Sequence, residues 1–125
     1  MVAIATLIEG QSLTQTMPPG PAIDTAHLAR MTLGERDLER EVLALFDRQA
    51  NMLLPRIRAG APALAAASAH TLKGSASSIG AFRVARAAEA VEQASRETAA
   101  IAAAIDMLAA MLDEAKAEIA RLLAD

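Results

Sequence analysis

A single histidine in a helix-forming segment is the clearest candidate for chemistry in this chain. His70 opens the stretch His-Thr-Leu-Lys-Gly-Ser-Ala-Ser-Ser, which lies in an alanine-rich region. A helix turns about 100° per residue, so Lys73, Gly74 and Ser77 share one stripe with His70. The imidazole is therefore predicted to face solvent beside a cation. Apolar residues fall roughly on the opposite side, at the spacing of a buried face: Ala65, Ala69, Leu72, Ala76 and Ile79.

The glycine at position 74 indicates that the imidazole must stay accessible. Side chains on a helix lean toward its N-terminus, so a larger residue at 74 would partly cover the ring of His70. Glycine inside a helix costs about 1 kcal/mol relative to alanine. A neutral imidazole is a good nucleophile near neutral pH, and Lys73 could neutralise an anion attached to it. Phosphate is the anion that such chemistry would carry, which makes the chain a candidate phosphoryl carrier.

Three other interpretations of this stripe are weaker. A structural histidine would face the core, whereas the periodicity places His70 opposite it. No metal site is expected, because no acidic residue follows His70 at i+3 or i+4, the chain has only two histidines, and Lys73 would repel a cation. Ser77 lies two turns from His70, about 10 Å along the axis, which is too far for a nucleophile and its base. We expect Ser75 and Ser77 to contact a partner instead.

The composition predicts an all-α protein. Hydrophobic residues make up 54% of the 125 residues but aromatic residues only 2%, and alanine favours helices whereas strands favour β-branched and aromatic residues. The absence of cysteine excludes disulfides and thiolate ligands. A net charge of −3 without a basic block argues against nucleic-acid binding. The apolar Met1–Ile8 is too short to span a membrane and lacks a basic leader, so we expect a cytoplasmic protein without a membrane segment.

The order of apolar patterns and helix breakers predicts an antiparallel up-down four-helix bundle with a short extra N-terminal helix. Residues 1–21 contain glycine and several prolines and are predicted to be a flexible arm or linker, within which Met1–Glu9 is either loosely attached or a short packing helix. The bundle domain is predicted over residues 22–125. Its short first helix is expected at Ile23–Met31, with Asp24 near the start.

The first long helix is expected over Glu35–Leu54, ended or kinked by Pro55, with Gly60 closing the segment. The helix that carries the histidine is expected from near Ala61 to Ile79, where Gly80 breaks it. The inward face of the first long helix is predicted to carry Leu38, Val42, Leu45, Phe46, Gln49, Met52 and Leu53.

Two more helices complete the predicted bundle. One starts at about Ala81 with Val84, Ala88 and Val91 inward. The last carries a seam whose spacings alternate between four and three, as in left-handed bundle packing. Thr98 could cap this last helix at its N-terminus. The alternative is one continuous helix from Ala81 to Leu123, about 65 Å long. A domain of this size would struggle to bury the apolar stripe of so long a helix, so we favour a turn before Thr98. The seam consists of Ile101, Ile105, Leu108, Leu112, Ala115, Ile119 and Leu122.

The segment around His70 closely resembles the signature of the histidine-containing phosphotransfer (HPt) domain family. That signature reads H-x-L-K-G-S followed a few residues later by G-A, and this chain has His-Thr-Leu-Lys-Gly-Ser followed by Gly80-Ala81. A weaker similarity covers roughly residues 22–124. The resemblance implies a four-helix bundle in which His70 is phosphorylated, Lys73 neutralises charge and Gly74 provides steric access. The flanking matches are Ile23-Asp24, Leu45-Phe46, Val84, Ala88 and Val91-Glu92.

The resemblance also implies a phosphorelay intermediate, which accepts a phosphoryl group from a receiver-domain aspartate and passes it to another receiver. The expected partners are response-regulator receiver domains and a hybrid sensor histidine kinase, with Mg²⁺ needed only in the receiver and this chain acting as a monomer without a cofactor. No glycine-rich nucleotide loop is present, so no kinase activity is expected. The alternative is a non-catalytic helical adaptor or dimerisation module that uses the Ile101–Leu122 seam.

Overall fold

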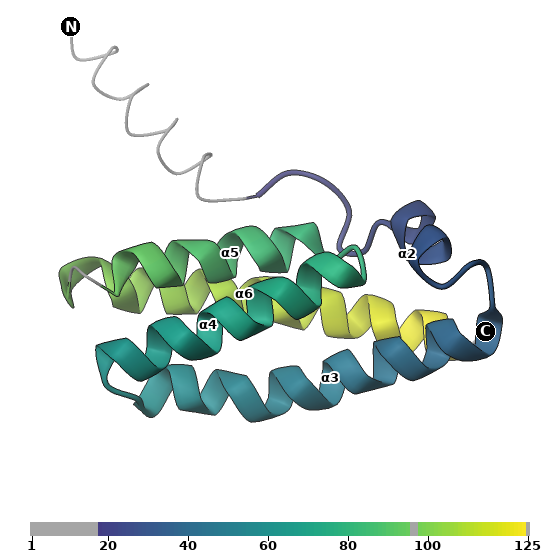
Figure 1. The fold of residues 1–125 in the computed structure, drawn as a ribbon. Helices are drawn as coiled ribbons and strands as arrows, with labels where there is room; N and C mark the ends of the chain where they lie inside the picture. The colour runs from purple at the N-terminus through teal and green to yellow at the C-terminus, as the bar shows by residue number, and fades with distance from the viewer. Residues whose placement is uncertain (1–17, 96–97, 125) are drawn as a thin grey trace, which may run out of the picture.

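The computed structural model describes residues 18–95 and 98–124, and its long helices form an antiparallel bundle (Figure 1). The four long helices run alternately up and down; α3 packs against α4 and α6, and α5 against the same two helices. The predicted all-α up-down bundle, preceded by a short extra helix, is confirmed. Most of the predicted arm, residues 1–17, lies outside the described residues. The helices are α2 (Thr25–Met31), α3 (Arg36–Ala59), α4 (Pro62–Ser78), α5 (Phe82–Ala94) and α6 (Thr98–Ala124).

The starts of α2 and α4 follow from residues that the sequence shows. The Asp24 carboxylate accepts a hydrogen bond from the His27 backbone N–H at 3.0 Å and caps α2. Pro62 occupies the first turn of α4, where its missing N–H costs nothing. The α5 helix ends at Ala94 and α6 begins at Thr98. The preferred break between them is therefore confirmed, while the capping role of the Thr98 side chain lies outside the described residues.

Two predictions for α3 are wrong. The helix does not end at Leu54 but continues through Pro55 to Ala59, because Pro55 faces solvent and the following turn buries Ile57, which is only 1% exposed. The inward face is also rotated. Leu45 and Met52 are 56% and 51% exposed, because α4 and α6 cover only one side of a helix that is apolar over more than half of its circumference. The buried residues of α3 are Leu43, Phe46, Ala50, Leu53 and Ile57.

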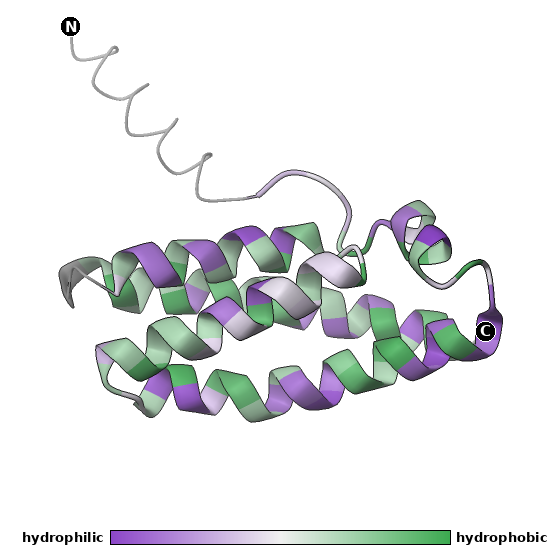
Figure 2. Ribbon diagram, in the orientation of Figure 1, coloured by the Kyte–Doolittle hydropathy of each residue, from purple (hydrophilic) through white to green (hydrophobic). Residues whose placement is uncertain are grey.

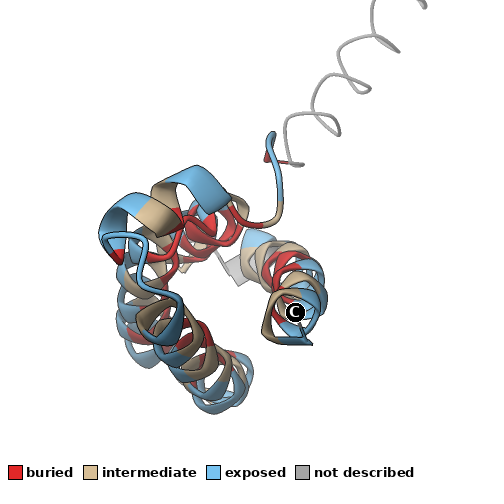
Figure 3. Cartoon of the chain, turned by 90° about the vertical axis from the view of Figure 1, so that its right-hand side faces the viewer, coloured by how far each residue is buried: buried red, intermediate tan, exposed pale blue. Residues whose placement is uncertain are grey.

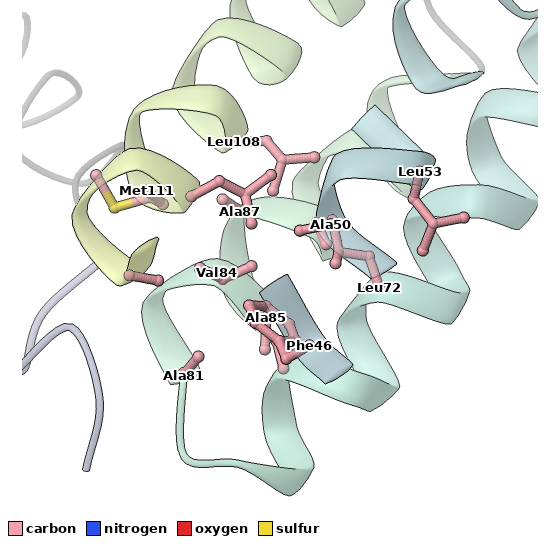
Figure 4. Packing of buried hydrophobic residues seen from close by; sticks show 14 of the residues in the cluster. Phe46, Ala50, Leu53, Leu72, Ala81, Val84, Ala85, Ala87, Leu108 and Met111 are labelled. Carbon is pink, nitrogen blue, oxygen red and sulfur yellow. The ribbon is translucent and has the colours of Figure 1, made fainter. Parts of the chain in front are cut away.

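Buried faces of all four long helices meet along the bundle axis, as the end-on view shows (Figure 3). Phe46, Leu72, Val84 and Leu108 lie together in this core (Figure 4). The predicted inward residues of α4 and α5 are all buried. The seam of α6 is buried at its centre and partly buried at Ile101. The centre of the seam on which the adaptor alternative depends is therefore buried inside this bundle.

Hydrophilic residues alternate with hydrophobic ones along α3 and α5, whereas α4 is mostly pale (Figure 2). The alternation along α3 and α5 is typical of helices with one face in a core and one in water. Among the residues that the structure describes, no helix combines the length and the apolar composition needed to cross a membrane.

The turn between α4 and α5 requires glycine at position 80. Gly80 has a φ of +84°, and a Cβ there would lie 2.6 Å from the Asp24 carbonyl oxygen. The Asp24 N–H donates to the Gly80 carbonyl at 2.9 Å, which joins this turn to the start of α2. We expect Gly80→Ala to lower the free energy of unfolding by about 1–3 kcal/mol, the cost of a side chain in a left-handed conformation. Chemical denaturation measures this; an unchanged midpoint would contradict it.

Candidate functional site

The imidazole of His70 lies on the outer face of α4, with 69% of its side chain exposed. Its neighbours Ala69 and Leu72 are fully buried on the opposite side of the helix. The predicted orientation of the histidine, away from the core, is therefore confirmed. The short side chains of α4 position the ring, because they let this helix approach α3 and α5 closely.

A carboxylate from the next helix joins the histidine and the lysine. Glu92 of α5 has its Oε2 3.0 Å from His70 Nδ1 and its Oε1 3.0 Å from Lys73 Nζ. Glu89, one turn earlier on α5, has its Oε2 3.9 Å from Lys73 Nζ. The lysine is thus paired with α5 as well as placed beside the ring. Sequence reasoning placed Glu92 only in the weak flanking similarity and missed this contact.

The ionisation of Glu92 determines which ring nitrogen of His70 carries the proton and which has a free lone pair. Burial raises the pKa of Glu92, but hydrogen bonding to Lys73 and His70, together with their charges, outweighs burial and holds that pKa below its ordinary value. An ionised carboxylate can only accept hydrogen bonds, so the shared proton belongs to His70 Nδ1. The lone pair of the neutral ring is then on Nε2, the nitrogen that does not face Glu92.

The space beyond the ring is open at Gly74. A Cβ at this position would have nothing within 4 Å apart from the helix's own backbone, and the φ of Gly74 is not positive. Neither packing nor backbone conformation therefore requires glycine here, in contrast to Gly80. The fold itself therefore gives no reason for glycine at this position, and the role of Gly74 in keeping the imidazole accessible stays a prediction.

The two serines predicted to bind a partner lie on different flanks of the histidine. Ser75 lines a groove between α2, α3 and α4. Ser77 lines a hollow between α4 and α5, together with Lys73, Phe82 and other residues of α5. The structure therefore brings Ser77 together with Lys73, while Ser75 belongs to a separate surface.

The groove beside Ser75 is an apolar surface one helix away from His70. Its volume is about 240 Å³, and its walls include Met31 and Leu45, which are 55% and 56% exposed. Leu38 and Val42 also line it. Val42 is partly buried against the core as well, so the stripe predicted to face the core lies partly on the wall of this groove. The sequence contains the signal for an apolar stripe on α3 but does not show which stripe the bundle covers.

The second histidine lies elsewhere. His27 is in α2, partly buried, with its ring in an edge contact with Phe82 at a centroid distance of 5.0 Å. No cluster of three or more histidine, cysteine, aspartate or glutamate side chains suitable for a metal ion occurs among the described residues.

A family model described as Hpt domain matches residues 40–122, about two thirds of the chain. The match includes all of α4 and α5, and with them His70, Lys73, Gly74 and Glu92. Neither the comparison with curated proteins nor that with solved structures found a match.

Proposed function

Because this chain belongs to the Hpt domain family, whose members carry phosphoryl groups in two-component phosphorelays without kinase activity of their own, we propose that His70 is its phosphoryl-accepting residue. The arrangement around the imidazole carries the proposal. The imidazole is exposed, its Nδ1 is held by Glu92 at 3.0 Å, and the space over Gly74 is open. This arrangement leaves the lone pair of Nε2 accessible for nucleophilic attack.

The transfer step follows from the tautomer. The Nε2 lone pair attacks the phosphorus of an aspartyl phosphate on a receiver domain. The P–O bond to the aspartate breaks, its electron pair leaves on the carboxylate, and an N–P bond forms. Nδ1 keeps its proton, so the ring gains a positive charge that faces the Glu92 carboxylate. The same bonds, broken and formed in reverse, deliver the phosphoryl group to an aspartate of a second receiver.

Lys73 is suited to the negative charge of the transferred group. Its ammonium carries three N–H donors, so it can keep its ion pair with Glu92 at 3.0 Å and also donate to a phosphoryl oxygen on the neighbouring ring. The side chain is only 29% exposed, which strengthens such a contact relative to open water. We assign Lys73 to charge neutralisation and Gly74 to steric access.

The partner surface extends from His70 to both flanks. A receiver must bring its aspartate into direct contact with the ring, and the apolar groove beside Ser75 offers a surface for its docking. Ser77 borders the contact on the α5 side. The partners in this proposal are receiver domains, including that of a hybrid sensor histidine kinase. The Mg²⁺ needed for transfer comes with the receiver, and this chain acts as a monomer.

Phosphoryl transfer from a labelled receiver tests the function directly. The chain should take up label when it is incubated with receiver domains that have been phosphorylated on aspartate. The bound phosphate should be labile in acid and stable in alkali, as expected of an N–P bond. Failure to accept label from any receiver of the same genome would contradict the proposal.

Replacing Lys73 by alanine should impair chemistry more than docking. We expect the transfer rate to fall about 10- to 100-fold, because the variant loses a charge that stabilises the phosphoryl group but no part of the apolar groove. The affinity for an unphosphorylated receiver, measured by calorimetry, should change little. Equal losses in affinity and rate would assign Lys73 to docking instead.

Replacing Glu92 should change the tautomer of His70. In Glu92→Ala the proton is no longer held on Nδ1, so ¹⁵N chemical shifts of the ring should show a mixture of tautomers and acceptance should slow about 10-fold, as when a partner that orients an imidazole is lost. Glu92→Gln retains an acceptor oxygen and should rescue much of the rate. A ring with unchanged ¹⁵N shifts in Glu92→Ala would contradict this role.

The Glu92 carboxylate also makes the stability of the folded protein depend on pH. Because the pKa of Glu92 is lowered in the folded protein, its contribution to stability is complete above the ordinary carboxyl pKa. That contribution disappears as the pH falls through the lowered value.

A further inference from the structure

A second apolar hollow lies between α5 and α6. The described chain begins beside α5 (Figure 1). It has a volume of about 570 Å³. Pro18 and Pro19 line one part of it. The other walls are apolar apart from Arg86: Ala87, Ala90, Ala94, Ala100, Ala103, Ala104 and Met107.

The first described residues are fixed to the bundle at this hollow. Pro18 is buried, and Arg83 Nη1 donates to the Gly20 carbonyl at 3.2 Å. The same Nη1 lies 3.3 Å from Glu114 Oε1 of α6, and the Arg83 side chain is only 18% exposed. The chain is therefore anchored at the hollow from Pro18 onward.

We propose that the apolar segment Val2–Ile8 of the same chain binds in this hollow. Six of its seven residues are apolar, and Thr6 is the exception. Walls built from alanine leave room for the larger Ile4, Leu7 and Ile8 side chains, whose burial removes apolar surface from water.

Reach and tethering favour this segment over a separate molecule. The nine linking residues, 9–17, can span about 30 Å when extended. The α6 wall from Ala100 to Met107 is only about 10 Å long, at 1.5 Å per residue. A linker of this length holds the segment near the hollow at roughly millimolar effective concentration.

Charge complementarity also supports this occupant. Arg86 is the charged residue of the wall, and no ion pair involves it within the described part of the chain. Glu9 follows the apolar segment directly. In this proposal, Glu9 is the acidic residue that pairs with the Arg86 guanidinium once Val2–Ile8 is bound.

Disulfide trapping tests the proposal. Because the chain has no native cysteine, only the introduced thiols can form a disulfide. The variant Ile4→Cys/Ala103→Cys places one thiol on the segment and one in the hollow. Its control is Ile4→Cys/Ala120→Cys, because Ala120 is an exposed residue of the same helix about 25 Å further along the axis. Both positions lie within reach of an undocked tail.

Under mild oxidation of the full chain, the pair at 4 and 103 should close an intramolecular disulfide about tenfold faster than the control pair, or more. Equal rates would overturn the proposal. A disulfide-linked dimer formed by the pair at 4 and 103 would also overturn it, since the hollow would then hold the segment of a second copy.

A further variant separates binding from proximity. Adding Leu7→Ser and Ile8→Ser to the Ile4→Cys/Ala103→Cys chain removes apolar side chains without altering either thiol. The rate advantage over the control pair should then be lost. If the advantage persists, the thiols meet without apolar binding and the proposal is wrong.

Discussion

A chain with His70→Gln should accept no phosphoryl group from any phosphorylated receiver. Glutamine lacks the nucleophilic ring nitrogen, but its amide can still donate a hydrogen bond to Glu92. Since His70 is largely exposed, we expect the free energy of unfolding to change by no more than about 0.5 kcal/mol. Transfer assays with labelled receiver, together with thermal unfolding, measure both effects.

The second histidine provides a matched control. His27→Gln makes the same chemical change in α2, where the ring packs against Phe82 and lies outside the site. This variant should accept label at nearly the wild-type rate. If His70→Gln still took up label and His27→Gln did not, the acceptor would be His27.

Gly74→Gln should slow phosphoryl transfer about 100-fold or more, the loss expected when reacting atoms are held apart by about an ångström. The glutamine side chain leans back over the ring of His70 into space that is open in this structure. The helix itself should tolerate the change, since glutamine is a better helix former than glycine. Rapid-quench kinetics against one receiver would measure the loss, and full-speed transfer would show that Gly74 is not needed for access.

Replacing Gly74 or Gly80 by alanine should change the free energy of unfolding in opposite directions. Gly74→Ala should raise the free energy of unfolding by up to about 1 kcal/mol, because the site is helical and unobstructed. The same variant should still slow transfer moderately. Gly80→Ala should destabilise the fold for the steric reason given above. A destabilised Gly74→Ala would mean that the fold, and not access, requires glycine at this position.

Local signals were sufficient to predict where most helices begin and end. Pro62 and Gly80 bound α4 in the structure as the sequence predicts, and Asp24 caps α2. The predicted end at Leu54 was wrong because one missing N–H on the exposed side of a helix costs less than leaving Ile57 unburied. Tertiary packing decided this boundary, and packing is not visible in a local pattern.

The inward face of α3 shows the same limit. Leu38, Val42 and Leu45 have the spacing of a core stripe, yet they line the groove beside Ser75. An apolar stripe on a helix shows that a face will be covered by something, either the rest of the fold or a partner. The helical pattern alone does not distinguish these outcomes.

The sequence predicted only the part of the site that lies on α4. Angular spacing on α4 placed His70 in solvent, with Lys73 and Ser77 on the same side, as the structure shows. Glu92 was missed because its contact depends on the register between α4 and α5. His70 and Glu92 lie at similar distances from the turn at Gly80, and in an antiparallel pair this spacing is the signal that could have identified the carboxylate.

The position of the phosphorus on the ring tests the central claim most directly. The chain should be labelled with ¹⁵N at histidine, phosphorylated by a receiver and examined in alkaline solution by NMR. We predict coupling between phosphorus and Nε2 of His70, with Nδ1 still carrying the proton that it shares with Glu92. Phosphorus on Nδ1 of His70, on His27, or on an oxygen that is not part of a histidine would contradict the account.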